Sequence, residues 1–256
     1  MIPERVDVVG TPISLVSSDQ LLDLLTDRPA DRATVVAFCN VHSVMTARAD
    51  AAVASALAGV DIATPDGMPI VWGLRSQGHP MQTRVDGPSF MRRAIEHGIA
   101  KKWRHYFYGS TQENLDSLVE TVQRTFPGVD VVGSFSPPFR QPTDEDIRDA
   151  AERILHSCPD LVWVGLGMPK QELWMQRIRS QLPGVGLLGV GAAFDFLAGT
   201  TRRAPRWMQA TGLEWLHRLA SEPRRLWRRY LFNNPAYLAL LARDLTRTRL
   251  RRQRSP

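Results

Sequence analysis

Residues 160–190 read DLVWVGLGMPKQELWMQRIRSQLPGVGLLGV, in which two short apolar runs flank a longer amphipathic stretch. The runs 160–165 and 185–190 have the length and the composition of buried strands. The stretch 169–181 predicts a helix, and Pro169 suits the first turn of that helix. Two strands that are joined through a helix run parallel in one sheet, so these residues predict an α/β fold.

The same alternation of strands and helices extends over the preceding residues. A short strand or hairpin at 5–16 is expected to join an edge of the sheet. We therefore predict that residues 1–199 form a core with a mostly parallel, Rossmann-like sheet and helices on both faces. The other predicted strands are 34–39, 60–64, 105–109 and 129–133, and the other predicted helices are 42–57, 86–99, 111–125 and 143–157.

Residues 200–256 differ in composition, and we expect them to form a helical, membrane-associating appendage with helix breaks at Pro223 and Pro235. The 256 residues carry a net charge of +6, yet residues 201–256 alone hold 14 arginines, no lysine and 3 acids. Residues 1–200 are, by contrast, mildly acidic. So basic a tail indicates an anionic partner, for which nucleic acid, anionic lipid and a diphosphate substrate are the candidates.

A helix over residues 223–231 would separate apolar from cationic side chains. At about 100° per residue, Leu226, Trp227, Tyr230 and Leu231 fall on one side, and the arginines fall on the other. A short helix of this composition is typical of a membrane interface. In the alternative interpretation, the aromatic stripe packs on the body of the protein. The stripe would also suit a second copy of the chain, so a homo-oligomer stays open.

The targeting features of the sequence predict a location inside the cell. No apolar run reaches the roughly 20 residues that cross a bilayer, and the N-terminus has no apolar core of a signal peptide. Cys39 and Cys158 have no ligand-like spacing and are typical of reduced thiols. We therefore expect a cytoplasmic protein that associates peripherally with the inner face of the cell membrane.

Polar residues follow two of the predicted strands and precede the helix after them. Asn40 follows the strand 34–39, and Asp66 follows the strand 60–64 within the turn Pro-Asp-Gly. Arg84 and Asp86 stand just before the next helix. These residues also fit a simple turn and a helix N-cap. Because ligands bind at the carboxyl ends of parallel strands, their combination predicts a polar cleft.

Two glycine-rich loops follow the last two predicted strands. GLGMPK (165–170) and GVGAAF (189–194) begin Gly-x-Gly, but neither completes a dinucleotide fingerprint. Such loops allow a close approach of the backbone to a phosphate or a nucleotide. The histidines show no metal-ligand spacing, and we expect neither a metal nor a cofactor. The polar side chains beside the two loops are Lys170, Gln171, Glu172 and Asp195.

Six segments resemble the signature segments of the WecG/TagA/CpsF glycosyltransferase family (glycosyltransferase family 26). The resemblance covers nearly the whole chain, in the same order, and its later blocks are long and specific. The segments are TPDGMPIVW (64–72), RVDGPSF (84–90), VWVGLGMPKQELW (162–174), GVGAAFDFLAG (189–199), RRAPRWMQATGLEWLHRL (202–219) and EPRRLWRRYL (222–231).

The resemblance implies an inverting, metal-independent enzyme of cell-surface polysaccharide biosynthesis. Such an enzyme takes a sugar, typically N-acetylmannosamine or its uronic acid, from a UDP-sugar. The acceptor is a sugar on a polyprenyl diphosphate at the membrane. Glucosyl or mannosyl donors stay open.

The resemblance also implies roles for individual residues. Asp66 would be the catalytic base, Asn40 would orient Asp66 or a sugar hydroxyl, and Arg84 would stabilise the leaving group. The family often has a threonine two residues before this asparagine, but this chain has Phe38 at that position. The resemblance therefore implies no role for a hydroxyl group at residue 38. The residues implied to bind the UDP moiety are Gly165, Gly167, Lys170, Gln171, Glu172, Gly191 and Asp195. The residues implied to bind the acceptor diphosphate are Arg218, Arg225 and Arg228.

Three other readings of the sequence compete with this one. The arginine-rich tail alone would also suit a nucleic-acid-binding protein, although no recognised nucleic-acid-binding fold accompanies it. The glycine-rich loops would suit an NAD-dependent oxidoreductase if the fingerprint were complete. A catalytically inactive scaffold of the same family is disfavoured, because Asp66, Arg84 and Gln171 occur together.

Overall fold

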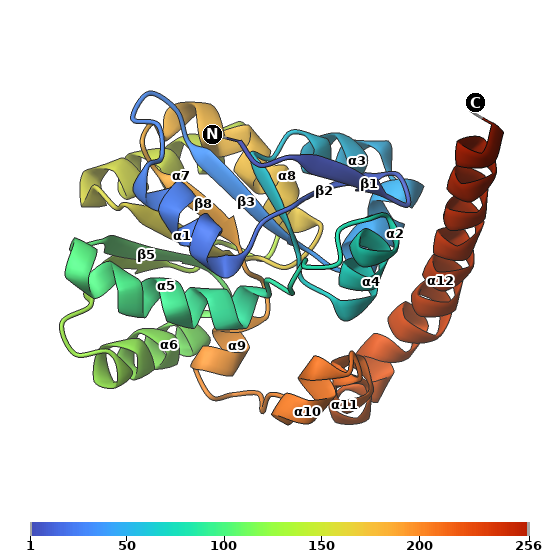
Figure 1. Cartoon of the computed structure of the whole chain (residues 1–256). Coiled ribbons are helices and arrows are strands. Elements are labelled where there is room, and N and C mark those ends of the chain that lie inside the picture. The colour runs from blue at the N-terminus through green and yellow to red at the C-terminus, as the bar shows by residue number, and fades with distance from the viewer. Residues whose placement is uncertain (1, 255–256) are drawn as a thin grey trace.

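The computed structural model describes residues 2–254, except for the side chains of Arg225, Arg229 and residues 247–254. Its centre is a sheet of six parallel strands with helices on both faces (Figure 1), which confirms the predicted α/β fold. The order across the sheet is β4 (Ile62–Pro65), β3 (Thr34–Cys39), β8 (Gly186–Gly189), β7 (Leu161–Gly165), β5 (Arg104–Gly109) and β6 (Asp130–Phe135).

Successive side chains of the strands enter two separate apolar clusters, one on each face of the sheet. On β3, Val35 and Ala37 join one cluster, whereas Val36 and Phe38 join the other. Burial on both faces explains why the strands read as continuous apolar runs. The first cluster is covered by α2 (Val41–Ala49), α3 (Ala51–Ala58), α4 (Met68–Ser76), α7 (Asp144–Ser157) and α8 (Lys170–Ile178). The second is covered by α1 (Ser18–Thr26), α5 (Gly87–Lys101), α6 (Gln112–Thr125) and α9 (Ala193–Leu197).

The N-terminal hairpin does not join an edge of the six-stranded sheet, so that expectation is wrong. Strands β1 (Arg5–Val8) and β2 (Thr11–Ser14) form a two-stranded sheet of their own. The connection to the main sheet runs through a side chain, because the Ser14 hydroxyl accepts a hydrogen bond from the Ala63 amide at 3.0 Å. This hydrogen bond satisfies one backbone N–H group of β4, but it does not make β2 a seventh strand of the main sheet.

The predicted helix 42–57 is in fact two helices, α2 and α3. Asp50 ends the first helix and caps the second, since its side chain accepts hydrogen bonds from the amides of Ala52 and Val53. Three further helices of the core, α1, α4 and α9, lie outside the predicted helix ranges. Helix α1 begins with a capping box that joins Ser17 and Gln20.

The C-terminal segment forms α10 (Arg206–Ala210), α11 (Glu214–Ser221) and α12 (Pro223–Arg254). The expected break at Pro235 is wrong, because α12 continues through that residue. Tertiary packing holds the helix there: Tyr237 is fully buried, and its hydroxyl donates to the carbonyl of Pro69 at 3.1 Å. In the part of the chain that the structure describes, no helix has the length and apolarity to cross a bilayer. The division at residue 199 stays a prediction.

Candidate active site

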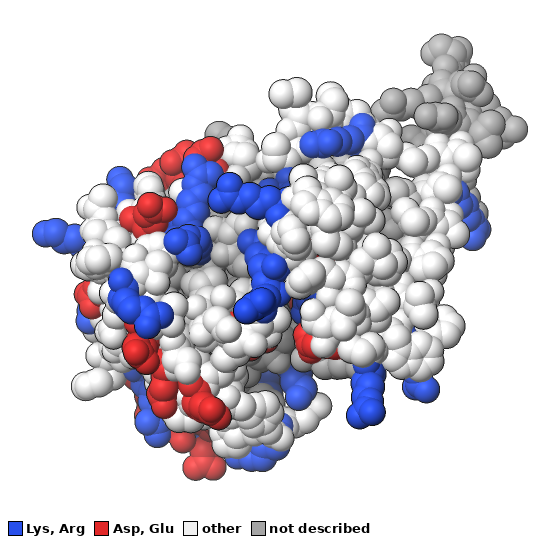
Figure 2. Space-filling view, turned by 90° about the horizontal axis from the view of Figure 1, so that it is seen from below, with Lys and Arg blue, Asp and Glu red and all other residues white. Residues whose placement is uncertain are grey.

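A pocket of about 490 Å³ lies at the carboxyl ends of the central strands. Its floor comes from the segments that follow β3, β4, β7 and β8, where a parallel sheet places its ligands. Its opposite wall comes from the appendage, through Glu214, Trp215 and Arg218 of α11 and Tyr230 and Asn234 of α12. Figure 2 shows arginine and lysine side chains around a hollow on the face seen from below. The appendage therefore forms part of the pocket.

The turn after β4 fixes Asp66 at the pocket. The Asp66 amide donates to the carbonyl of Cys39 at 2.9 Å, which ties the turn to the end of β3. Arg84 donates from Nε to the Asp66 carbonyl at 3.2 Å and from Nη2 to Asp66 Oδ1 at 3.4 Å. The Val85 amide donates to the carbonyl of Pro65 at 3.0 Å, so the segment of Arg84 runs beside the turn. Both side chains line the pocket.

Asn40 serves as the N-cap of α2. Its Oδ1 accepts hydrogen bonds from the amides of His42 at 3.0 Å and Ser43 at 3.3 Å. Asn40 also packs on the turn of Asp66, since a Cβ at Gly67 would lie 3.6 Å from Cβ of Asn40. The capping bonds give Asn40 a structural role in addition to the role that the resemblance implies.

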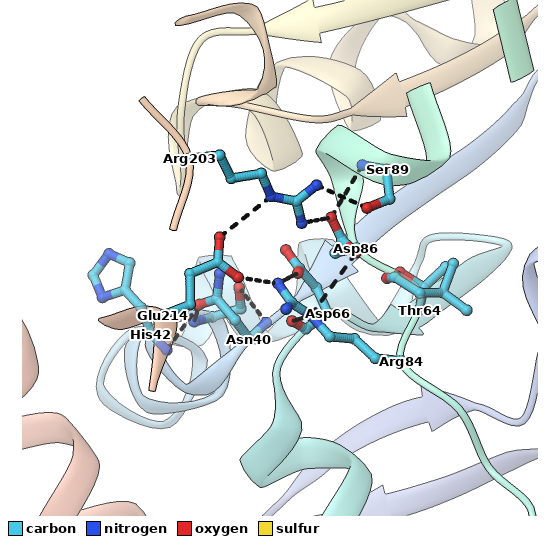
Figure 3. A network of polar contacts seen from close by, with 11 residues as sticks. Asn40, His42, Thr64, Asp66, Arg84, Asp86, Ser89, Arg203 and Glu214 are labelled. Carbon is cyan, nitrogen blue, oxygen red and sulfur yellow. Dashed lines mark hydrogen bonds and ion pairs between the residues drawn. The ribbon is translucent and has the colours of Figure 1, made fainter. Parts of the chain in front are cut away.

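Two residues of the appendage segment enter a network of ion pairs with Arg84 (Figure 3). Glu214 Oε2 lies 2.8 Å from Arg84 Nη2. Arg203 pairs with Asp86, donates to the Ser89 hydroxyl at 2.8 Å and lies 3.6 Å from Glu214. Arg84 Nε is 4.0 Å from Asp86, which closes a ring of alternating charges. The sequence reasoning missed Arg203 and Glu214, although both lie in segments that resemble the family.

The electrostatics of the pocket leave Asp66 weakly acidic. Burial raises the pKa of the Asp66 carboxyl to about 7; the Arg84 guanidinium opposes this rise, and Asp86 and Glu214 add to it. For Arg84, burial disfavours the charge, but the three carboxylates outweigh it and raise the pKa above its ordinary value. Asp66 is thus a carboxylate that exchanges its proton near neutral pH, whereas Arg84 stays charged.

Gln171 lines the pocket with its amide held in one orientation. The Nε2 group donates to Glu172 Oε1 at 2.9 Å and to the carbonyl of Gly189 at 2.8 Å. Both amide protons are therefore used, and the oxygen that remains has no hydrogen-bond partner among the described residues. A Cβ at Gly191 would lie 3.4 Å from that oxygen. The hydrogen-bonding capacity that Gln171 has left is consequently that of an acceptor, and it has no proton left to donate to a phosphate.

The neighbours of Gln171 do not line this pocket. Glu172 is 1% exposed, and burial raises the pKa of its carboxyl to about 7. Lys170 is exposed and lines an adjacent cavity of about 680 Å³. Their predicted contact with a UDP moiety in the 490 Å³ pocket therefore has no geometric support.

The two glycine-rich loops and Asp195 all border the pocket. Gly165 has a structural reason to be glycine, because a Cβ there would lie 2.4 Å from the ring of Phe194. Gly167 and Gly191 have φ angles of +77° and +52°, which favour glycine. Asp195 Oδ1 accepts a hydrogen bond from the side-chain amide nitrogen of Asn114 at 3.0 Å.

The predicted membrane residues divide between the interior and the surface. Leu226 and Tyr230 are 2% and 9% exposed, so the prediction that they contact a membrane is wrong. Tyr230 packs near Trp215, with ring centroids 5.8 Å apart, and lines the pocket. Trp227 and Leu231 are exposed, as is their neighbour Phe232, which the sequence reasoning missed. The apolar stripe of the helix is thus shared between the body of the protein and the solvent.

The predicted acceptor-binding arginines also differ in position. Arg218 lines the pocket, with its guanidinium 5.8 Å from the ring centre of Phe196. Arg228 is exposed, stacks on Trp227 at 5.2 Å and does not line the pocket. The side chain of Arg225 lies outside the described residues. Within those residues, no group of three or more His, Cys, Asp and Glu side chains is arranged to hold a metal ion.

Comparison with known proteins assigns the sequence to a family. A sequence profile described as the Glycosyl transferase WecG/TagA/CpsF family matches residues 6–252. A relative from Bacillus spizizenii is 34% identical over 175 residues, which are 68% of this chain and 66% of the relative. A relative from Bacillus subtilis strain 168 is 31% identical over 167 residues, 65% of this chain and 63% of the relative.

Both relatives are named N-acetylglucosaminyldiphosphoundecaprenol N-acetyl-beta-D-mannosaminyltransferase. The chain spans slightly less than two thirds of the length of each of them. The profile, in contrast, covers almost every residue from the first strand to the last helix. The chain therefore belongs to the WecG/TagA/CpsF family of glycosyl transferases.

Proposed function

We propose that the protein is an inverting glycosyltransferase that moves a sugar from a UDP-sugar to a sugar carried on a polyprenyl diphosphate. Family membership supports the reaction class. The names of the two relatives describe the transfer of an N-acetylmannosaminyl group to a diphosphoundecaprenol-linked sugar, which supports the acceptor class and N-acetylmannosamine as the first donor sugar to test. The product would enter cell-surface polysaccharide biosynthesis.

The observation that carries this proposal is the position and the acidity of Asp66. A general base works best when its pKa lies near the working pH and its oxygen can reach the proton. Asp66 lines the pocket, and burial raises the pKa of its carboxyl to about 7. In the proposed step, the proton of the acceptor hydroxyl passes to Asp66 as the hydroxyl oxygen bonds to the anomeric carbon. The bond from that carbon to the UDP oxygen breaks, and its electron pair leaves with UDP.

Guanidinium groups would receive the leaving diphosphate in the proposed reaction. Asp66, Asp86 and Glu214 are each paired with an arginine, so the negative charge of this cluster is already balanced by guanidinium groups. Arg218 lines the pocket from the appendage, and a planar guanidinium binds two phosphate oxygens at once. We therefore propose a reaction that does not depend on a metal ion, and we expect EDTA to leave its rate unchanged.

The polar groups beside the glycine-rich loops would bind the donor. Asp195 suits a ribose or uracil contact, because its carboxylate borders the loop of Gly191. The free amide oxygen of Gln171 suits an O–H or N–H of the nucleoside or of the sugar. Gln171 would thus bind the donor as a hydrogen-bond acceptor and not as a donor to the leaving diphosphate.

The appendage would place the pocket at the inner surface of the cell membrane. Trp227, Leu231 and Phe232 form an exposed apolar surface on α12, and the exposed arginines on the same helix suit anionic lipid headgroups. A peripheral position of this kind would bring a lipid-linked acceptor to the pocket without a spanning helix.

The decisive experiment offers the purified protein a panel of UDP-sugars with a synthetic lipid-diphosphate N-acetylglucosamine, and it identifies the product by mass spectrometry. We expect one glycosyl addition with an inverted anomeric configuration. An Asp66→Asn variant should lose about 100-fold or more in turnover while it still binds UDP. Absence of transfer from every UDP-sugar, or full activity of Asp66→Asn, would refute the proposal.

A further inference from the structure

One nitrogen atom of Arg84 is shared between a residue of the core and a residue of the appendage. Arg84 Nη2 lies 2.8 Å from Glu214 Oε2 and 3.4 Å from Asp66 Oδ1. The shorter ion pair belongs to Glu214, whose position in the chain is 130 residues beyond that of Arg84. Glu214 therefore competes with Asp66 for the same cation, and at these distances Glu214 holds it more closely.

The position of Glu214 is itself fixed by the ring of charges in Figure 3. Arg203 lies 3.6 Å from Glu214 and pairs with Asp86, which caps α5 through the Ser89 amide at 3.0 Å. The side chains of Arg84, Asp86 and Glu214 are largely buried, so solvent screens their interactions only weakly. The docked appendage thus delivers one carboxylate to a defined place beside Arg84.

Glu214 acts on Asp66 in two ways that have the same sign. It takes the shorter of the two ion pairs that Arg84 Nη2 makes, and it adds a negative charge nearby. Each effect disfavours the ionised form of Asp66. The charged and titratable side chains that line the pocket or act electrostatically on Asp66 are Cys39 at the end of β3, His42 on α2, Arg84 and Asp86 before α5, Asp195 on α9, Glu214 and Arg218 on α11, and Tyr230 on α12, with Arg203 behind them.

We propose that Glu214 is a positioning residue, through which the docked appendage holds Arg84 partly away from Asp66 and keeps that carboxylate basic enough to accept a proton. The inference rests on the proposed role of Asp66 as the base. It assigns the appendage an effect on the chemical step that is separate from any effect on membrane binding. Glu214 needs no contact with the substrate for this effect.

A carboxyl ¹³C NMR titration of the full chain tests the inference without any substrate, with the Asp66 signal assigned by its loss in Asp66→Asn. We expect Glu214→Gln to lower the pKa of Asp66 by about one unit, because the amide keeps the shape but removes the charge. The matched control is Asp144→Asn, which removes a carboxylate from another 2.8 Å arginine pair, on α7. It should leave the pKa of Asp66 unchanged.

Docking of the appendage is monitored in each variant by limited trypsin digestion at Arg202, Arg203 and Arg206. A lower pKa in a Glu214→Gln protein that resists trypsin as well as the wild type does would support the proposal. An unchanged pKa, or a pKa that changes only when the appendage becomes cleavable, would overturn it.

In the transfer assay, the apparent pKa on the acid side of the pH profile of kcat/KM should be lower in Glu214→Gln than in the wild type, by the same amount as the pKa measured by NMR. If no substrate is turned over, the proposed function fails. The NMR titration still shows in that case whether Glu214 raises the pKa of Asp66.

Discussion

The amide nitrogen of Gln171 lies 2.9 Å from Oε1 of Glu172, a carboxylate that is 1% exposed. The same nitrogen lies 2.8 Å from the carbonyl of Gly189, so two acceptors face one NH₂ group. This arrangement explains why an amide rather than a carboxylate stands at position 171, since a carboxylate would place a third acceptor beside the other two.

We therefore expect Gln171→Glu to destabilise the protein by roughly 2–3 kcal/mol at pH 8, because it replaces two buried hydrogen bonds by repulsion. Gln171→Met should cost less, because it removes the bonds without adding a charge. Chemical denaturation measures the free energy of unfolding of both variants. Gln181→Glu, at a half-buried position, controls for the general effect of replacing a glutamine by a glutamate. Equal stability of Gln171→Glu and wild type would contradict the proposed orientation of the amide.

The pKa of Asp66 also links stability to pH. Since the folded-state pKa of about 7 lies above the ordinary value of an aspartate, the folded protein binds this proton more tightly than the unfolded chain does. The contribution of Asp66 to stability is therefore complete below about pH 4 and is lost as the pH rises to about 7. Relative to Asp66→Asn, the wild type should lose on the order of 2–4 kcal/mol across this range.

Urea denaturation of both proteins at closely spaced pH values measures the difference directly. The activity should change in the opposite direction, because the base must be ionised, so kcat/KM should rise with pH through about 7. A stability difference that stays constant from pH 4 to pH 8 would exclude a raised pKa for Asp66.

The exposed part of the apolar stripe predicts the mode of membrane binding. The triple variant Trp227→Ser, Leu231→Ser and Phe232→Ser should reduce flotation with anionic liposomes at least about tenfold, since three large apolar side chains no longer enter the interface. The matched control is Met81→Ser, which removes an apolar side chain that is 87% exposed and lies outside the appendage. A gel shift with RNA at several salt concentrations tests the rival partner. Strong RNA binding together with unchanged flotation of the triple variant would favour nucleic acid.

Gly165 should resist substitution for a reason that has nothing to do with ligand binding. A Cβ there would lie 2.4 Å from the ring of the buried Phe194, so Gly165→Ala should cost about 1–3 kcal/mol through overpacking. Phe194→Leu should recover part of this loss in the double variant, which a double-mutant cycle quantifies. Gly67→Ala is the control, because its φ is −124° and its nearest neighbouring atom is 3.6 Å away. Additive effects at positions 165 and 194 would argue against the contact.

The fold was largely predictable because most strands of its main sheet are buried on both faces. Runs such as 34–39 and 160–165 are continuous and apolar, and longer amphipathic stretches separate them. Helix α4 had a weak local signal, since it is nine residues long and contains both Pro69 and Gly73. The capping box of α1, in contrast, was a local signal that the sequence reasoning missed. The path of α12 through Pro235 depends on the burial of Tyr237, which no local pattern reveals.

Topology alone predicted the candidate site where its residues follow strands. Asn40 and Asp66 come directly after β3 and β4, so the topology of a parallel sheet brings them together. Arg203 and Glu214 belong to a distant segment, and their pairing with Asp86 and Arg84 depends on how that segment folds back. The helical periodicity likewise identified the apolar side of α12, but it could not tell which of its side chains the body covers.

The wall that α11 and α12 add to the pocket has a consequence for the synthesis of the protein. A nascent chain has made all six strands of the sheet by Gly189, yet it still lacks Glu214, Arg218 and Tyr230. The pocket can close only after the ribosome has translated the start of α12. A prematurely terminated product that keeps the whole sheet would therefore have an open pocket, without the ion pair between Glu214 and Arg84.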